Sequence, residues 1–97
     1  MLLSIPYRVG DTVSLKLVSG EEVVAKLEEE TTDTISISKP VSLGMGPNGP
    51  ALTPFMLTSD VTNNIKIRNQ HVLAIGKTNS QVDSQYIQST TGIALAG

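Results

Sequence analysis

The sequence has no cysteine and a single histidine, His71. The absence of thiols excludes disulfide bonds and thiolate metal sites, and one histidine cannot build a zinc site without a group of carboxylates around it. Aromatic residues are also few, since Tyr7, Phe55 and Tyr86 make up 3% of the 97 residues. Stacking of single-stranded nucleic acid needs several exposed rings, so this composition argues against an extended stacking surface.

Charged residues are scarce as well. They account for 16% of the chain, against about 25% in typical globular proteins, and the net charge is −2. A negative net charge argues against broad electrostatic capture of nucleic acid, although it leaves room for a local basic ring. The surface must be built mostly from Ser, Thr, Asn and Gln. Such a weakly charged surface is easily buried against another copy of the chain.

Long hydrophobic runs are missing too. No apolar stretch approaches the roughly 20 residues that span a bilayer. Residues 1–6 lack a basic segment followed by a long apolar one, so they do not predict a signal peptide. We expect a cytoplasmic protein of one domain, with a core thin enough that contacts with partners add stability.

Alternation of apolar and polar residues predicts short β-strands along most of the chain. Residues 13–17 and 23–27 alternate cleanly on either side of Gly20, which predicts a hairpin. A third strand starts at Ile35 and extends to about residue 43, with an edge or a bulge at Pro40.

The second half of the chain continues this pattern with an interruption. Residues 51–58 are apolar but contain Pro54, so we expect them to form the edge-like first half of a fourth strand. We expect residues 60–64 to form a bulge or turn. Residues 65–68 would then form the second half of the fourth strand, and residues 71–75 would form a fifth strand.

Five short antiparallel strands predict an all-β fold, a small and strongly bent SH3-like barrel, because closure removes most exposed sheet edges. We expect Phe55 in the core or at an interface. We expect Tyr7 to plug one end of the barrel rather than to stack beside Arg8. The barrel would span residues 1–79, and residues 80–97 would form a helix or tail.

The tail carries signals of a short helix. Ser80 is a suitable N-cap, and Asp83 resembles the acidic half of a capping box. Gly92 suits the position after the last turn, from which Ile93 could fold back on Ile87. Val82, Tyr86 and Thr90 would share the docking face. The alternative is a disordered tail rich in Ser, Thr and Gln.

Several patterns that suggest ligand or catalytic sites have simpler explanations. Residues 44–49 match G-x-G-x-x-G, but Pro47 removes a donor and no helix follows, so we predict a turn. Residues 28–30 are three glutamates that would alternate in direction on a strand end and cannot converge on one cation. No nucleophile elbow accompanies His71. We therefore expect no catalytic residue, no metal site and no cofactor.

Two stretches resemble the two sequence motifs of Sm-like and Hfq-like proteins. Residues 13–27, VSLKLVSGEEVVAKL, resemble the first motif in their alternation, turn glycine, Val pair, small residue and final Leu. Residues 67–75, IRNQHVLAI, resemble the second motif, Ile-Arg-Gly-x-x-Ile-x-x-Ile. The long middle segment and the C-terminal helix look more like the divergent Sm-like proteins of tailed phages than like cellular Sm proteins.

The resemblance implies that two loops line a ring pore and hold a uridine-type base. The candidate RNA-binding residues are Thr32, Asp33, Ile35, Arg68 and Asn69. Some positions depart from the family pattern: no Asn follows Asp33 at the expected spacing, and Asn69 replaces a glycine, although Asn tolerates positive φ. Arg68 could contact RNA around the ring axis or form an ion pair with Asp33 or Asp60.

The resemblance also implies a homo-oligomeric ring of about five to seven subunits, in which the fourth strand of one subunit pairs with the fifth of the next. The candidate interface residues are Ile65, Ile67, Val72, Leu73 and Ile75. We therefore predict a non-catalytic ring-forming protein that binds single-stranded RNA at the pore loops. The alternative is a structural or assembly adaptor that binds protein. The negative net charge and the altered pocket motif favour the adaptor, and Ile67 with Arg68 favours RNA.

Overall fold

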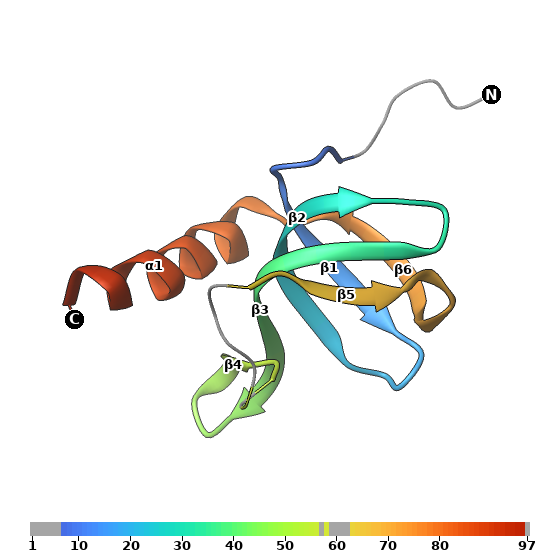
Figure 1. The fold of residues 1–97 in the computed structure, drawn as a ribbon. Coiled ribbons are helices and arrows are strands. Elements are labelled where there is room, and N and C mark those ends of the chain that lie inside the picture. Colours follow the sequence, from blue (N-terminus) through green and yellow to red (C-terminus); the bar gives the residue numbers. More distant parts are fainter. Residues whose placement is uncertain (1–6, 57, 59–62, 97) are drawn as a thin grey trace.

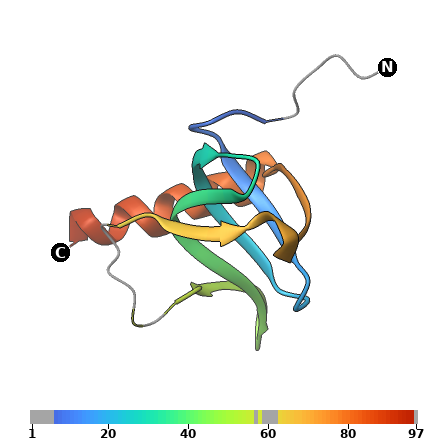
Figure 2. The same cartoon turned by 45° about the vertical axis from the view of Figure 1, so that its right-hand side comes forward.

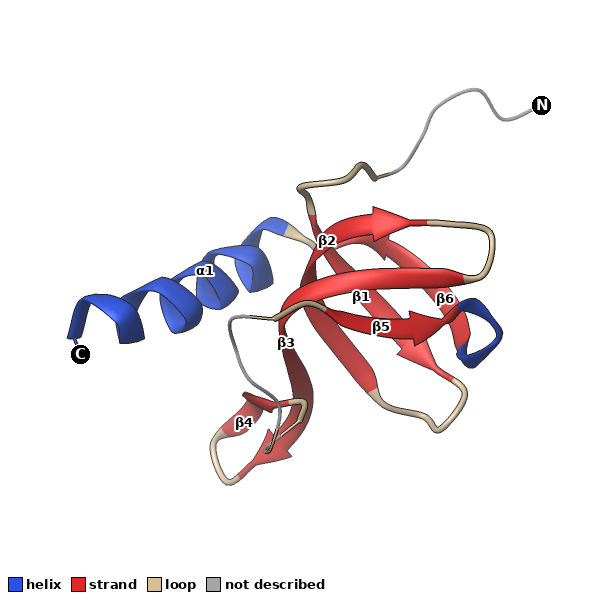
Figure 3. Ribbon diagram, viewed as in Figure 1, coloured by secondary structure: helices blue, strands red, loops and turns tan. Residues whose placement is uncertain are grey.

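The computed structural model describes residues 7–56, 58 and 63–96, with the side chains of residues 91–96 left aside. This part of the chain forms one antiparallel sheet and a C-terminal helix (Figures 1 and 3). The elements are β1 (Thr12–Leu17), β2 (Glu22–Glu30), β3 (Thr34–Gly46), β4 (Gly49–Pro54), β5 (Ile65–Arg68), the 3-10 helix η1 (Asn69–His71), β6 (Val72–Lys77) and α1 (Ser80–Ala96). The strand order is β4-β3-β2-β1-β6, and β5 also pairs with β3. The predicted hairpin of β1 and β2 is confirmed, with Gly20 at φ +99° in its turn.

The sheet is strongly bent because β2 and β3 carry bulges where they pair. Between two aligned stretches, β3 contains two residues, Lys39 and Pro40, opposite Ala25 alone. Lys39 has φ +50°, in the left-handed region. A bulge of this kind bends a strand and increases its twist. The irregularity expected at Pro40 is therefore confirmed, and it divides β3 into two halves that face different partners.

The expected fourth strand is two separate strands in the structure. Both β4 and β5 lie along the border of β3 that β2 leaves open, β4 on its second half and β5 on its first. Pro54 ends β4, which fits an edge position where a missing N–H is tolerated. The sequence alternation before residue 51 was too weak to predict that β4 begins at Gly49. The bulge expected at residues 60–64 lies mostly outside the described residues.

The core lies inside the bend of the sheet. The buried inward side chains come from the first three strands: Val13, Leu15, Leu17, Val23, Ala25, Leu27, Ile35 and Ile37. Phe55 packs against this core, as predicted.

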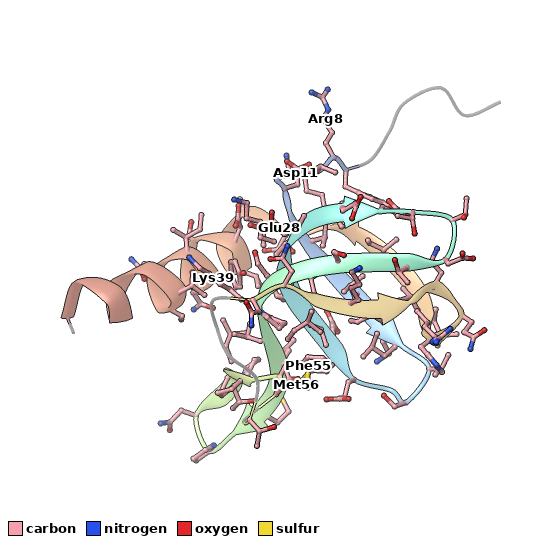
Figure 4. All side chains as sticks on the ribbon, viewed as in Figure 1. Arg8, Asp11, Glu28, Lys39, Phe55 and Met56 are labelled. Atoms are coloured by element: carbon pink, nitrogen blue, oxygen red, sulfur yellow. The ribbon has the colours of Figure 1, made fainter. Side chains whose placement is uncertain are left out.

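Tyr7 also packs against the core and donates a hydrogen bond to the Glu30 carboxylate at 3.1 Å, while Arg8 points away from the barrel (Figure 4). Burial, then the hydrogen bond and charge of Glu30, raise the pKa of Tyr7. Tyr7 therefore has the plug position expected of it.

The C-terminal helix forms, but its boundaries differ from those predicted. The N-cap is Asn79, whose side-chain oxygen accepts the N–H of Val82 at 2.9 Å, so the expected cap at Ser80 is wrong by one residue. The helix also continues through Gly92 to Ala96 instead of ending there. A helical glycine costs only about 1 kcal/mol relative to Ala, and the residues that follow are mostly good helix formers. Because the backbone stays helical, the fold-back expected after Gly92 does not occur.

Tyr86 docks α1 on the outer face of the sheet. Its hydroxyl donates to the carbonyls of Ser38 at 3.2 Å and Lys39 at 2.8 Å, at the β3 bulge. Tyr86 is 4% exposed, and Val24, on the outer face of β2, is 1% exposed. The helix lies against this bent part of the sheet and its C-terminal half extends beyond it (Figures 1 and 2). Within the described residues, no helix is long and apolar enough to span a bilayer.

The buried position of Tyr86 can be tested by titration of the Tyr7→Phe protein, in which Tyr86 is the only tyrosine. Burial, with the charges of Asp83 and Glu28, raises the pKa of Tyr86 from 10.0 to about 12, against a smaller opposite effect of the Lys26 backbone. Phenolate absorbance should therefore rise with a midpoint near pH 12.

Folding raises the pKa of Tyr86, so burial of its neutral phenol contributes to stability. This contribution is fully present below pH 10 and is lost as the pH rises toward 12. The Tyr7→Phe protein should consequently lose stability over this range more steeply than the Tyr7→Phe, Tyr86→Phe double variant. A midpoint near 10 in the folded protein would contradict the docking of α1.

Candidate functional site

Two loops that are far apart in the sequence meet at one end of the barrel. Residues 31–33 connect β2 to β3, and Arg68–Asn69 form the junction of β5 and η1. Thr34 pairs with Arg68, so the antiparallel register places the end of β5 beside the start of β3 (Figure 3). We call residues 31–33, Arg68 and Asn69 the loop pair. The structure thus brings together most of the residues that the family resemblance selected.

Asn69 holds the loop pair together. Its backbone N–H donates to the carbonyl of Asp33 at 2.9 Å. Its side-chain amide donates to the carbonyls of Thr31 at 3.1 Å and Thr32 at 3.0 Å. Its side-chain oxygen is buried and accepts no hydrogen bond from the described residues. Lys39 is the one non-glycine residue with positive φ in the described part of the chain, so Asn69 does not use the positive φ that its residue type tolerates, and it acts through its amide instead.

Thr31 closes the first loop on itself. Its hydroxyl accepts the N–H groups of Asp33 at 3.2 Å and Thr34 at 3.0 Å, and its own N–H donates to the carbonyl of Thr34 at 2.8 Å. Hydroxyl groups stabilise turns in this way. Sequence reasoning selected the two residues that follow Thr31, Thr32 and Asp33, and missed Thr31 itself. The run of Ser/Thr/Asp-type residues between two strands was the available signal.

The predicted RNA-binding residues differ in their exposure. Thr32, Asp33 and Arg68 have exposed side chains, and Asn69 is half-buried. Ile35 is 2% exposed and belongs to the barrel core, so its side chain supports the loop from below and cannot contact a ligand in this conformation. Alternation along β3 directs Ile35 inward, on the same side as Ile37, so it is the one candidate RNA-binding residue that lies in the core.

The charges around the loop pair are mixed. Arg68 and Lys66 are exposed and alternate with inward isoleucines on β5, so both lie on its outer face. Asp33 is exposed in the facing loop, and Glu29 is exposed at the end of β2. In the described part of the chain Arg68 forms no ion pair, so the expected pair with Asp33 is absent, while Asp60 lies outside that part. The Arg68 guanidinium remains exposed to solvent.

The second feature of interest is the pair of strand edges. Among the described strands, β5 pairs with β3 alone and β6 with β1 alone, so each has one edge without a strand partner. Four of the five candidate interface residues are half-buried and pack against the core: Ile65, Ile67, Val72 and Ile75. Leu73 differs, since it is 66% exposed at the irregularity where β6 begins.

Other chemistry finds little support in the geometry. Across residues 7–56, 58 and 63–96, no group of three or more His, Cys, Asp or Glu side chains is arranged to hold a metal ion. The Glu28 carboxylate instead accepts a hydrogen bond from the Ser38 hydroxyl. The G-x-G-x-x-G match is the tip of the hairpin of β3 and β4, where Gly46 pairs with Gly49 and no helix begins, which confirms the predicted turn.

Replacement of Asn69 should loosen the loop pair. Asn69→Ala removes two amide donors and should lower the free energy of unfolding by about 1 kcal/mol, because partly exposed carbonyls can still bind water. Backbone amide exchange at Asn69 should accelerate. Gln70→Ala, at an exposed neighbouring position, is the matched control and should change neither quantity. Unchanged exchange in Asn69→Ala would show that the side chain does not join the loops.

Comparison with known proteins bears on the fold. No protein-family model matches the sequence, and no curated protein sequence matches it. The structure is similar to that of a heptameric archaeal Sm protein, a crystal structure described for its implications for the eukaryotic snRNP core. The TM-score is 0.51 at 14% sequence identity, and the match covers 73% of this chain and 90% of that chain. At this level of identity the similarity concerns the fold, and the chain has the Sm-like fold that its two motifs predicted.

Proposed function

We propose that this protein is a non-catalytic, ring-forming subunit whose copies join head to tail by pairing β5 of one subunit with β6 of the next. The observation that carries the proposal is that both strands end the described sheet with an unpaired edge. An exposed edge presents unpaired N–H and C=O groups to any neighbouring strand. Two different edges on one subunit give a head-to-tail contact. Such contacts form a ring when the rotation from each subunit to the next adds up to a full turn.

The similarity to a heptameric Sm protein supports this arrangement. We propose a ring of about five to seven subunits, a range within which a small change of rotation per subunit alters the number of copies. The proposed interface consists of the backbone edges and the apolar side chains beside them: Ile65 and Ile67 on β5, and Val72, Leu73 and Ile75 on β6. Leu73 is the most exposed of them, so it gains most from burial against a neighbour.

We further propose that the loop pair binds single-stranded RNA. A ring repeats Arg68 around its axis and concentrates positive potential there, although one subunit is acidic. Arg68 is exposed and forms no ion pair with a described residue, so its guanidinium can reach a phosphate or a base edge. Thr32 and Asp33 add a hydroxyl and a carboxylate from the facing loop, and Asn69 fixes the spacing between the two loops.

A structural or assembly role without nucleic acid is the second candidate. The amide donors of Asn69 are already bound to loop carbonyls, so they are not available to a base. Asp33 places negative charge in the loop that faces Arg68, which opposes phosphate binding. In this case the ring would act as a phage-type adaptor that binds another protein.

The assembly can be tested with Leu73→Lys. A lysine at this edge places a charge in the proposed apolar contact, so the ring should dissociate into smaller species in native mass spectrometry. Leu73 is 66% exposed in the subunit, so the fold itself should not change. Val18→Lys, at a position 52% exposed in the turn between β1 and β2, is the control and should leave the ring intact. A monomeric wild-type protein would refute the ring.

RNA binding can be tested by titration of labelled oligo(U) into the assembly at about 50 mM and about 200 mM salt. We expect micromolar binding that weakens as salt rises, and a loss of about tenfold or more in Arg68→Ala because the change is repeated in every subunit. Lys16→Ala removes an exposed cation from β1, away from the loop pair, and should have a small effect. No binding at the lower salt concentration would exclude the RNA role and leave the structural one.

A further inference from the structure

The hairpin of β3 and β4 has an apolar face outside the barrel core. Cross-strand partners share a face, and so do alternate residues along a strand. The register therefore gathers six apolar side chains on one side: Val41, Leu43, Met45, Pro50, Leu52 and Pro54. Their cross-strand neighbours on the other side are small or carry hydroxyl groups. We call these six residues the hairpin face, of which Met45 is 80% exposed.

The hairpin face is continuous with the surface on which α1 docks. Val41 pairs with Val24, which lies on the outer face of β2 and is almost fully buried. Tyr86 of α1 binds the carbonyls of Ser38 and Lys39 next to it. The apolar surface thus begins at Val24 and Val41 and continues along the hairpin. The hairpin projects away from the barrel (Figure 1).

The hairpin carries no charged side chain, and the helix carries only Asp83, in its first turn. Residues 40–59 contain no Asp, Glu, Lys or Arg, and none occurs after Asp83. Exposed apolar residues in a segment depleted of charge are typical of the buried centre of a protein–protein interface. Glu22 pairs with Leu43 at the border of this face, and the hairpin itself offers no charged group to a charged peptide or a nucleic acid. The chemistry fits a partner that is itself apolar and uncharged.

The backbone edge of β4 is closed to further strands. The N–H of Phe55 donates to the carbonyl of Pro40 on β3 at 3.3 Å, so the outward N–H positions of β4 are 50, 52 and 54. Prolines occupy positions 50 and 54, and proline has no N–H to offer. Only Leu52 keeps an outward donor. The hairpin can therefore contact a partner through its face and not through strand addition.

The topology indicates which partner reaches this face. β4 and β5 lie along the same border of β3, so a neighbour that pairs its β6 with β5 also lies beside the hairpin. In that neighbour, β6 leads through Thr78 and Asn79 directly into α1. The C-terminal half of α1 extends beyond its own sheet (Figure 2).

We propose that the hairpin face of one subunit binds α1 of the neighbouring subunit, as a second contact beside the strand pairing. This inference rests on the ring assembly proposed above. It gives the hairpin and the helix, which is uncharged after Asp83, a common role, since each covers the other across the subunit boundary. It also explains why an edge strand rich in proline retains an apolar face.

Met45→Lys tests the second contact. In native mass spectrometry of a dilution series, this variant should raise the subunit concentration at half-dissociation by about tenfold or more, because an ammonium group enters an apolar contact. Val18→Lys is again the exposed control and should match the wild type. A Met45→Lys ring as resistant to dilution as the wild type would overturn this inference alone. A wild-type protein that is monomeric would overturn the ring as well.

Cross-linking tests the partner directly, since the chain has no native cysteine. Subunits carrying Met45→Cys and subunits carrying Gln88→Cys would be assembled together and treated with a short thiol cross-linker. We expect a covalent dimer of the two kinds of subunit. Val18→Cys mixed with Gln88→Cys should give none. Intact mixed rings without a Met45–Gln88 cross-link would contradict the placement of α1 on the hairpin.

Discussion

The bulge at Lys39 and Pro40 is the constraint on which the rest of the structure depends. It turns β3 so that one strand serves two partners along the same border, β5 on its first half and β4 on its second. It also leaves two carbonyls at the outer face of the sheet, and Tyr86 donates to both. The bend that encloses the core, the position of the hairpin and the docking of the helix therefore share one cause.

This geometry connects the loop pair to the strand edges. β5 ends at Arg68 and Asn69, so the strand that presents an open edge also carries half of the candidate binding loops. Assembly through β5 would fix the position of Arg68 in every subunit with respect to the ring axis. The proposed interface and the proposed binding site are thus coupled through four residues of backbone. Conditions that weaken the strand contact should also weaken the binding of a ligand at the loop pair.

Much of the fold could be predicted from the sequence because its period-two alternation is clear on β1, β2, the first half of β3 and β5. The family resemblance located both loops of the candidate site. The boundaries of β4 were not predictable, since Pro50 and Pro54 look like strand breakers until the edge position of the strand is known. The helix cap was misplaced by one residue because Asn79 and Ser80 are both good cap residues.

The parts of the site that could not be predicted depend on long-range contacts. The side chain of Asn69 reaches a loop 37 and 38 residues earlier in the chain, and no local pattern encodes that distance. Ile35 was assigned to the binding site from its motif position, whereas the packing of β3 places it in the core. The hairpin face is visible in the sequence only as a run without charge. Its six residues share one side because of the register with β3, which only the folded chain reveals.

Amide hydrogen exchange along β6 in the assembled protein is the most direct test of the account. The N–H of Thr78 donates to the carbonyl of Thr12, so Ala74 and Gly76 point their N–H groups toward β1, and Ile75 and Lys77 point theirs outward. If β6 pairs with β5 of a neighbour, the outward amides should exchange as slowly as the inward ones. Rapid exchange at Ile75 and Lys77, with slow exchange at Ala74 and Gly76, would show an unpaired edge and contradict the ring.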